Sequence, residues 1–145
     1  SPKQDNILKI IFKNISENGG LLIIDYAKMN GGVGDTLQAI SAHKKRSIFY
    51  QPGDTDLTCL VDMKRYIEIG RNMNINSFGP INQCEFLLNL GIYERYKILK
   101  SHASDENKNI LDRQYHHLID PDKMGELFKV LYFSNNRSSV PEGMK

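Results

Sequence analysis

A short apolar run that ends on an acid constrains this chain more than any other feature. Residues 21–24 are leucine and isoleucine without a polar interruption, and Asp25 follows them directly. A continuous apolar run of this length is typical of a strand that is covered on both faces of a sheet. Ligands of open α/β sheets gather at the carboxyl ends of such strands. Asp25 and the neighbouring Tyr26 are therefore predicted to face a cleft.

A glycine-rich loop follows the predicted strand and contributes further candidate residues. It carries Gly34 and ends on Asp35 and Thr36, and a later turn introduces Asp56 and Thr58. The loop lacks the Gly-Lys-Ser/Thr ending of a phosphate-binding loop and the glycine spacing of the dinucleotide fingerprint. A plain connecting loop is therefore favoured over a loop that cradles a phosphate.

The carboxylates of this region have competing interpretations. Asp25 can accept hydrogen bonds from a ligand hydroxyl, amine or guanidinium, or it can cap the loop that follows it. Asp56 and Asp62, with Thr58 between them, do not have the spacing of a calcium loop, so no metal site is predicted. Asp62 is instead predicted to cap a helix over residues 63–72, because its carboxylate can accept from the free N–H groups of the first turn.

The rest of the chain alternates helices and strands, which indicates an α/β fold. Residues 35–50 fit either a strand or a short helix. The predicted elements are a helix over 3–18, a strand over 21–25, an extended segment over 57–61, a helix over 63–72, an extended segment over 75–81 that ends near Pro80, three helices within about 82–118, a strand over 127–133 and a disordered tail over 135–145.

Composition limits the classes of partner. The 145 residues carry a net charge of only +2, so there is no electrostatic case for nucleic acid. No apolar stretch approaches the roughly 20 residues of a membrane helix, and the N-terminus has no signal-peptide pattern. The one dense basic run, residues 44–46, is interpreted as a solvated surface because no aromatic residues are interleaved with it.

Several phrases, in a fixed order along the chain, resemble one protein family. They are Gly20-Leu-Leu-Ile-Ile-Asp-Tyr26, Gly34-Asp-Thr-Leu-Gln-Ala39, His43, Pro52-Gly53 with Asp56-Leu-Thr58 and Val61-Asp62, Gly79-Pro-Ile-Asn-Gln83 with Glu85-Phe-Leu87, Leu90-Gly-Ile92 with Arg95, and Met124-Gly-Glu-Leu-Phe-Lys-Val-Leu131. Together they resemble the MidA-like S-adenosylmethionine-dependent methyltransferases. That family includes mitochondrial arginine methyltransferases of complex I assembly and their bacterial relatives.

The resemblance implies the C-terminal half of a class I (Rossmann-like) methyltransferase fold over residues 1–134. The strands at 21–25, 75–81 and 127–133 would then be the fifth, sixth and seventh. The seventh would insert antiparallel between the other two, after a helical insertion at about 82–118.

The resemblance also implies where the functional residues lie. The substrate side of the cleft would be lined by Asp25, Tyr26, Asp35 and Thr36. The loop and the following helix would be organised by Gly34, Asp56, Thr58 and Asp62.

S-adenosylmethionine is the cofactor of the complete family domain, and the family binds it with elements that precede the fifth strand. No cofactor-binding residue and no cofactor binding are therefore expected of this chain alone. The resemblance implies a protein substrate, no nucleic acid and no membrane. It places the protein in the bacterial cytoplasm or, in a eukaryote, in the mitochondrial matrix. An unpaired edge of the strand at 21–25 would favour a separately encoded N-terminal half, or a second copy, as partner.

Two other functions stay open. A non-catalytic interaction module, or the remnant of a split methyltransferase gene, would use the helical insertion as its binding element. An unrelated small nucleotide-binding protein would use the loop at residues 31–36.

Overall fold

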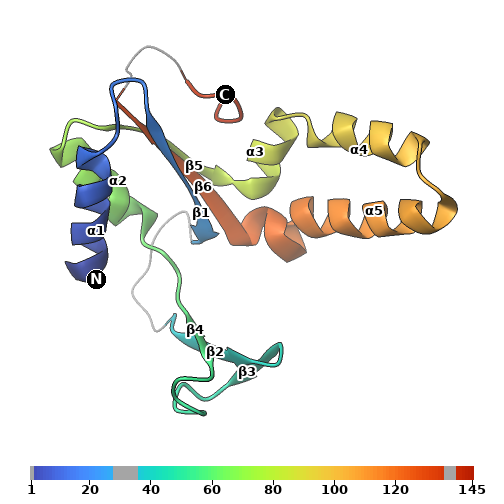
Figure 1. Cartoon of the computed structure of the whole chain (residues 1–145), viewed down its shortest axis with the longest axis horizontal. Helices are drawn as coiled ribbons and strands as arrows, with labels where there is room; N and C mark the ends of the chain where they lie inside the picture. Colours follow the sequence, from blue (N-terminus) through green and yellow to red (C-terminus); the bar gives the residue numbers. More distant parts are fainter. Residues whose placement is uncertain (1, 28–35, 136–139) are drawn as a thin grey trace.

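The computed structural model describes residues 2–27, 36–135 and 140–145. Figure 1 shows a central sheet with helices beside it, a small separate sheet, and a long helical hairpin. The elements follow one another as α1 (Pro2–Lys13), β1 (Gly20–Tyr26), β2 (Gln38–Ser41), β3 (Lys44–Arg46), β4 (Asp56–Thr58), α2 (Met63–Asn72), β5 (Asn76–Asn82), α3 (Gln83–Asn89), α4 (Ile92–Ser101), α5 (Asp105–Ile119), the single π-helical turn η1 (Pro121–Gly125) and β6 (Phe128–Ser134).

The main sheet, β1-β6-β5, confirms the predicted strand order. β6 is antiparallel to both of its neighbours and lies between them. Along its length β1 pairs with β6 alone among the described residues, and just past its end Ala27 forms a single parallel bridge with Val61. The last strand along the chain therefore occupies the centre of the sheet, as the resemblance implied.

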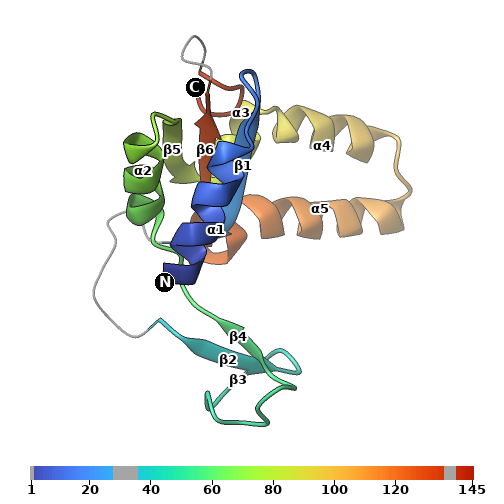
Figure 2. The same cartoon turned by 60° about the vertical axis from the view of Figure 1, so that its left-hand side comes forward.

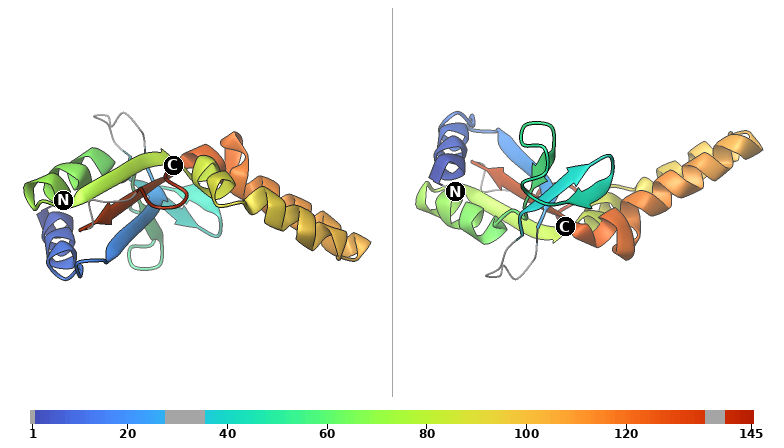
Figure 3. Two further views of the ribbon diagram at one scale, coloured as in Figure 1. Left: turned by 90° about the horizontal axis from the view of Figure 1, so that it is seen from above. Right: turned by 90° about the horizontal axis from the view of Figure 1, so that it is seen from below.

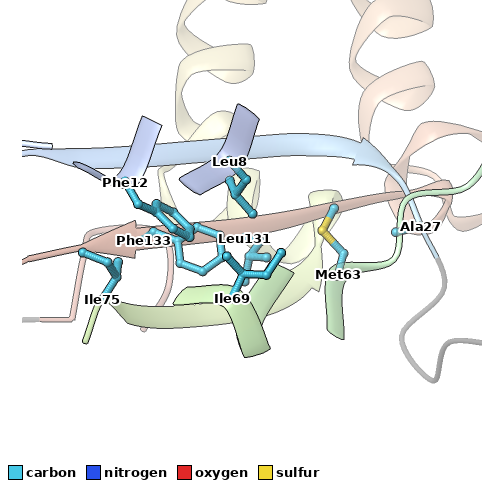
Figure 4. Close-up of a cluster of buried hydrophobic side chains, with 8 residues drawn as sticks. All are labelled: Leu8, Phe12, Ala27, Met63, Ile69, Ile75, Leu131 and Phe133. Carbon is cyan, nitrogen blue, oxygen red and sulfur yellow. The ribbon is translucent and has the colours of Figure 1, made fainter. Parts of the chain in front are cut away.

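One face of the main sheet holds the hydrophobic core (Figure 4). Leu8 and Phe12 of α1 and Ile69 of α2 pack on Leu131 and Phe133 of β6. The rings of Phe12 and Phe133 meet edge to face, with their centroids 4.7 Å apart. Alternation along β6 directs its odd-numbered side chains to this face, so α1 and α2 cover the sheet together.

Helix α1 is shorter than predicted and buries only part of its apolar stripe. It ends at Lys13, where the Asn14 side chain donates to the Ile10 carbonyl, rather than continuing to residue 18. Ile7 and Ile10 are 58% and 61% exposed, whereas Leu8 and Phe12 are buried in the core. The described residues therefore cover only one side of the apolar surface of α1.

The prediction that β5 ends at Pro80 is wrong. The strand continues to Asn82, and a register shift between Phe78 and Ile81 takes Pro80 out of the ladder. A bulge is one of the few places where a strand tolerates a residue without an N–H. Gly79 precedes the proline with a φ of 92°, and a Cβ there would lie 2.7 Å from the Val130 carbonyl oxygen.

The predicted helical insertion is present as α3, α4 and α5. Helices α4 and α5 form a hairpin that projects away from the main sheet, as both views of Figure 3 show. The rings of Tyr96 and Tyr115 stack 4.4 Å apart between the two helices, and Lys100 pairs with Asp112 at 2.7 Å. Ser104 caps α5, accepting from the Asn107 N–H. Residues 120–121 lead into η1.

The C-terminal residues contact α3. Residues 140–145, which the sequence analysis placed in a disordered tail, receive two hydrogen bonds from the Asn89 side chain, to the Gly143 and Lys145 carbonyls. Gly143 has a φ of 83° and lies directly against the Phe86 ring. A backbone position in the left-handed region favours glycine, so this close contact depends on Gly143.

The second sheet is small and lies beyond the carboxyl end of β1 (Figures 1 and 2). We call it the mini-sheet; its strand order is β3-β2-β4, and all its pairings are antiparallel. It resolves the ambiguous segment at residues 35–50 into two strands. The extended segment predicted over 57–61 is a strand only over Asp56–Thr58.

Candidate functional site

A pocket of about 330 Å³ lies between the end of β1 and the mini-sheet. It brings together residues from three separate parts of the chain: the end of β1, the mini-sheet with the segment that follows it, and the residue before β6. Its lining consists of Tyr26, Thr36, Gln38, Ile40, Lys45, Thr58, Cys59, Leu60 and Leu127. Three of the predicted site residues, Tyr26, Thr36 and Thr58, are among them.

Strand β1 delivers Tyr26 to this pocket. Side chains alternate between the two faces of a strand, and Leu22, Ile24 and Tyr26 occupy the face opposite the core. The Tyr26 ring lies 4.2 Å, between centroids, from the ring of Phe128, its cross-strand partner on β6. This contact fixes the orientation of the tyrosine ring at the carboxyl end of the strand.

The mini-sheet contributes the opposite wall through cross-strand neighbours. Gln38 lies directly opposite Thr58, and Ile40 lies directly opposite Lys45. Residues that face each other across an antiparallel pair project from the same face of the sheet. A two-residue alternation therefore places these four side chains together at the pocket.

Two hydrogen bonds close the base of the mini-sheet. The Thr36 hydroxyl accepts from the Leu60 N–H at 3.3 Å, and the Val61 N–H donates to the Tyr26 carbonyl at 2.7 Å. These contacts join the beginning and the end of the segment between β1 and α2 that contains the mini-sheet. They hold the mini-sheet against the end of β1, although few mini-sheet residues are buried.

Asp25 does not line the pocket. It projects from the other face of β1, and its Oδ1 accepts from the Tyr26 N–H at 2.7 Å. Burial raises the pKa of the Tyr66 hydroxyl, and the nearby Asp25 carboxylate raises it further. The structure thus separates the two adjacent residues that the sequence analysis had assigned to one cleft. A substrate-binding role for Asp25 stays a prediction.

The remaining predicted residues fall into three groups. Gly34 and Asp35 lie outside the described residues. Asp56 is exposed and is not part of the pocket lining, although it lies directly opposite Ile40. Asp62 caps α2 as predicted, because its Oδ1 accepts from the Arg65 N–H at 3.1 Å.

Sequence reasoning did not identify most of the pocket wall. Gln38, Ile40 and Lys45 were not candidates, because the pairing of residues 38–41 with 44–46 was not predicted. The alternation of polar and apolar residues in 38–41 was the available signal. Leu127, just before β6, carries no local signal, since its place in the pocket depends on strand order alone.

The described lining of the pocket contains one charged residue, Lys45, and no carboxylate. Ribose hydroxyls, such as those of S-adenosylmethionine, favour a carboxylate acceptor. No cluster of histidine, cysteine, aspartate or glutamate suited to a metal ion occurs among the described residues. Within the described part of the chain, no helix is long and apolar enough to span a bilayer.

Comparison with known proteins gives one consistent result. A family described as "Putative S-adenosyl-L-methionine-dependent methyltransferase" matches residues 1–81. The chain is 37% identical over 125 residues to the protein arginine methyltransferase NDUFAF7 homolog of Drosophila melanogaster, covering 84% of this chain and 28% of that protein. It is 35% identical over 130 residues to human protein arginine methyltransferase NDUFAF7, covering 88% of this chain and 29% of the human protein. The chain thus spans less than a third of the length of these relatives.

Solved structures agree with the fold. A crystal structure from Burkholderia thailandensis with S-adenosyl-homocysteine bound superposes with a TM-score of 0.80 at 23% identity. The match covers 96% of this chain and 37% of the other protein. A native crystal structure from the same organism gives a TM-score of 0.79. At this identity the likeness establishes the fold of the chain and leaves its chemistry open.

Proposed function

Because the chain belongs to the S-adenosyl-L-methionine-dependent methyltransferase family whose model matches its residues 1–81, we propose that it forms the C-terminal part of a protein arginine methyltransferase. The relatives named as arginine methyltransferases support the choice of acceptor. The pocket at the end of β1 supports the assignment of this region to the acceptor side. Following the resemblance, we extend the proposal to the assembly of respiratory complex I.

Two observations together carry the proposal: the family to which the chain belongs and the residues that line the pocket. The pocket lies at a strand end, where open α/β sheets bind ligands, and its described lining has no carboxylate to accept from the ribose of the cofactor. The methyl donor would therefore be held by other residues of the complete domain. In this arrangement Tyr26, Thr36 and Thr58 orient the acceptor, and no proton-transfer role is assigned to them.

Two apolar surfaces support a requirement for further protein. Leu22 and Ile24 on β1 are 45% and 43% exposed. The edge of β1 that faces away from β6 pairs with no described residue along Gly20–Tyr26. Ile7 and Ile10 are exposed on α1 nearby. Unpaired edges with apolar neighbours favour strand pairing with another chain or segment. We propose that the cofactor-binding part of the family domain, encoded separately or with this chain, covers this surface.

Cofactor binding gives the first test. Calorimetric titration of this chain with S-adenosylmethionine is expected to show no heat of binding. Micromolar affinity would overturn the assignment of the cofactor to other residues. Size-exclusion chromatography at high concentration tests association through β1, since a clean monomer would exclude a second copy as the partner.

Methyl transfer gives the second test. The chain is combined with the polypeptide encoded beside it or, if both lie in one reading frame, studied as the whole product. Tritiated S-adenosylmethionine is then expected to label arginine in protein acceptors. Tyr26→Leu is expected to lower the rate roughly tenfold through misplacement of the acceptor. Tyr93→Leu, on the distant hairpin, serves as the matched control. Label in another residue type, or none, would contradict the proposal.

A second function, a non-catalytic interaction module, is favoured by the hairpin. Neither α4 nor α5 contains a buried residue, and Tyr93, Ile98 and Leu99 are exposed along α4. The neighbouring reading frame separates the two functions. A strand followed by Gly-x-Gly, encoded in the neighbouring frame or continuous with this chain, supports the enzyme, and its absence from both supports the module or the remnant of a split gene. For localisation, we propose the mitochondrial matrix in a eukaryote, following the mitochondrial relatives, or the cytoplasm in a bacterium.

A further inference from the structure

The mini-sheet presents an unpaired basic edge. All three residues of β3, Lys44, Lys45 and Arg46, are exposed, and none forms an ion pair within the described part of the chain. The Arg46 guanidinium lies over the Tyr50 ring, 5.1 Å from its centroid. Because β3 is an edge strand, no further strand of the mini-sheet covers its outer side; alternation places Lys45 on the pocket face and Lys44 and Arg46 on the opposite face.

Apolar side chains lie close to this edge in sequence and remain exposed. Phe49 is 81% exposed, and Ile48 and Tyr50 are also exposed. Within the three strands of the mini-sheet only Ala39 is buried. We call Lys44, Lys45, Arg46, Phe49 and Tyr50 the β3 strip. Basic edge residues alone would suffice to block unwanted strand pairing, but that role does not require exposed aromatic rings beside them.

The β3 strip is continuous with the pocket through Lys45. Lys45 lies opposite Ile40 and is the charged member of the described pocket lining. The acceptor of the proposed function is an arginine, whose guanidinium is always cationic. A lysine beside the pocket therefore opposes its entry. A carboxylate next to the arginine in the substrate would neutralise Lys45 and remove this opposition.

The charges of the mini-sheet determine on which of its edges an acidic substrate segment is attracted. Asp56 is on the same face as Lys45 but on the far strand, with Ile40 between them. Strands are spaced about 4.8 Å apart, so the backbones that carry the two side chains are about 10 Å apart. The β3 edge is thus basic and the β4 edge acidic. Acidic residues of a substrate are attracted to β3 and repelled from β4.

We propose that the β3 strip docks an acidic segment of the protein substrate and thereby selects arginines flanked by aspartate or glutamate. The inference rests on the proposed function, because the acceptor side of the pocket is part of its argument. Beyond the proposed function, the inference specifies the substrate sequence: an arginine with acidic neighbours. Carboxylates pair with Lys44–Arg46, while apolar side chains of the segment pack on Phe49 and Tyr50.

Direct binding tests the inference without requiring methyl transfer. A fluorescein-labelled peptide with a central arginine flanked by glutamates is titrated with the whole chain, and anisotropy is recorded. Matched peptides carry glutamine or lysine in place of glutamate. The glutamate peptide is expected to bind tightest, and its advantage is expected to shrink between about 0.02 M and about 0.3 M salt, because salt screens exposed charges.

Charge reversal locates the contact. The variant Lys44→Glu, Lys45→Glu, Arg46→Glu is expected to weaken the glutamate peptide at least tenfold and to favour the lysine peptide, since each of three exposed pairs changes sign. A matched variant, Lys3→Glu, Lys9→Glu, Lys13→Glu, makes the same charge change on exposed positions of α1. It is expected to alter the glutamate preference by less than about twofold. Circular dichroism checks that both variants are folded.

Several outcomes would overturn the inference. Equal affinity for the three peptides would remove the acidic preference, and equal losses in the two variants would show a nonspecific charge effect. Tighter binding of a single-stranded oligonucleotide than of the glutamate peptide would assign the β3 strip to nucleic acid instead. Failure of methyl transfer with a preserved glutamate preference would refute the proposed function and leave docking intact.

Discussion

The main sheet and the mini-sheet are stabilised in different ways. In the main sheet, Val130, Leu131 and Phe133 of β6 are fully buried, and two helices cover one face. In the mini-sheet only Ala39 is buried, and two hydrogen bonds hold its base. Burial of apolar surface is the dominant favourable contribution to folding, so the main sheet carries the stability. In the proposed docking, the mini-sheet presents side chains to the substrate.

The largest expected effect tests where the stability lies. Phe133→Ala removes a fully buried ring that contacts Phe12, and it is expected to cost about 3–5 kcal/mol of unfolding free energy. Urea denaturation followed by circular dichroism measures the loss. The matched variant Phe49→Ala, in the loop between β3 and β4, is expected to change stability by less than about 0.5 kcal/mol. Similar losses from both would abolish the contrast between the two sheets.

A smaller effect is expected at the junction between the two regions. Asp62→Ala removes the cap of α2 and is expected to cost about 1 kcal/mol, because the Arg65 N–H loses its acceptor. Asp62→Asn keeps an acceptor oxygen and is expected to retain most of that stability. Equal destabilisation by both variants would show that the charge of Asp62, rather than the hydrogen bond, is responsible. Thermal unfolding distinguishes these outcomes.

A local effect is expected at the base of the mini-sheet. Thr36→Val removes the hydroxyl that accepts from the Leu60 N–H and is expected to lower the local opening free energy by about 1 kcal/mol. Hydrogen exchange should report faster exchange in residues 38–58, with unchanged protection in β6. Thr55→Val, whose hydroxyl donates to the Tyr50 carbonyl, is the control and should alter only residues 50–55. Loss of protection in β6 would mean that the two sheets unfold together.

The smallest effect concerns an ion pair on the core side. Two nitrogens of Arg65 donate to the Asp5 carboxylate, at 2.8 and 3.1 Å, and these bonds lower the pKa of Asp5 from its ordinary value of 3.8. A lowered pKa in the folded state stabilises the protein above the unfolded value, and this contribution is lost as the pH falls through the folded value.

Comparison of Asp5→Asn with the unaltered chain tests this sign. The variant is expected to be slightly less stable at neutral pH, and the difference should vanish at a pH below the lowered pKa of Asp5. The pH dependence of thermal unfolding provides the measurement. A constant difference at every pH would show that the contact acts through packing rather than charge.

Local features of the structure were predictable from the sequence. Asp62 and Ser104 cap the helices that follow them, because a cap depends on residues only three positions apart. The apolar run before Asp25 forms a strand as predicted, but the described residues cover only one of its faces, so the prediction of a strand covered on both faces is wrong. The antiparallel position of β6 between β1 and β5 came from the family resemblance, since periodicity alone does not specify which strands pair.

The candidate site was less predictable. Alternation along β1 implied that Asp25 and Tyr26 point to opposite faces, but it did not say which face would be covered by helices. The docking of α1 and α2 decided this and left Tyr26 at the pocket. Lys45 enters the site through pairing with Ile40, and Leu127 enters through the position of β6. Such contacts join distant residues, which a local pattern does not encode.

The sequence by itself determined the family, through phrases in a fixed order along the chain, and the strand at β1 and the cap that begins α2, because a strand and a cap depend on residues close together in the chain. The tertiary structure alone decided which face of β1 meets solvent, how residues 35–50 fold and which side chains form the pocket. These outcomes depend on strand pairing and helix docking, whose free energy comes from contacts between segments far apart in sequence.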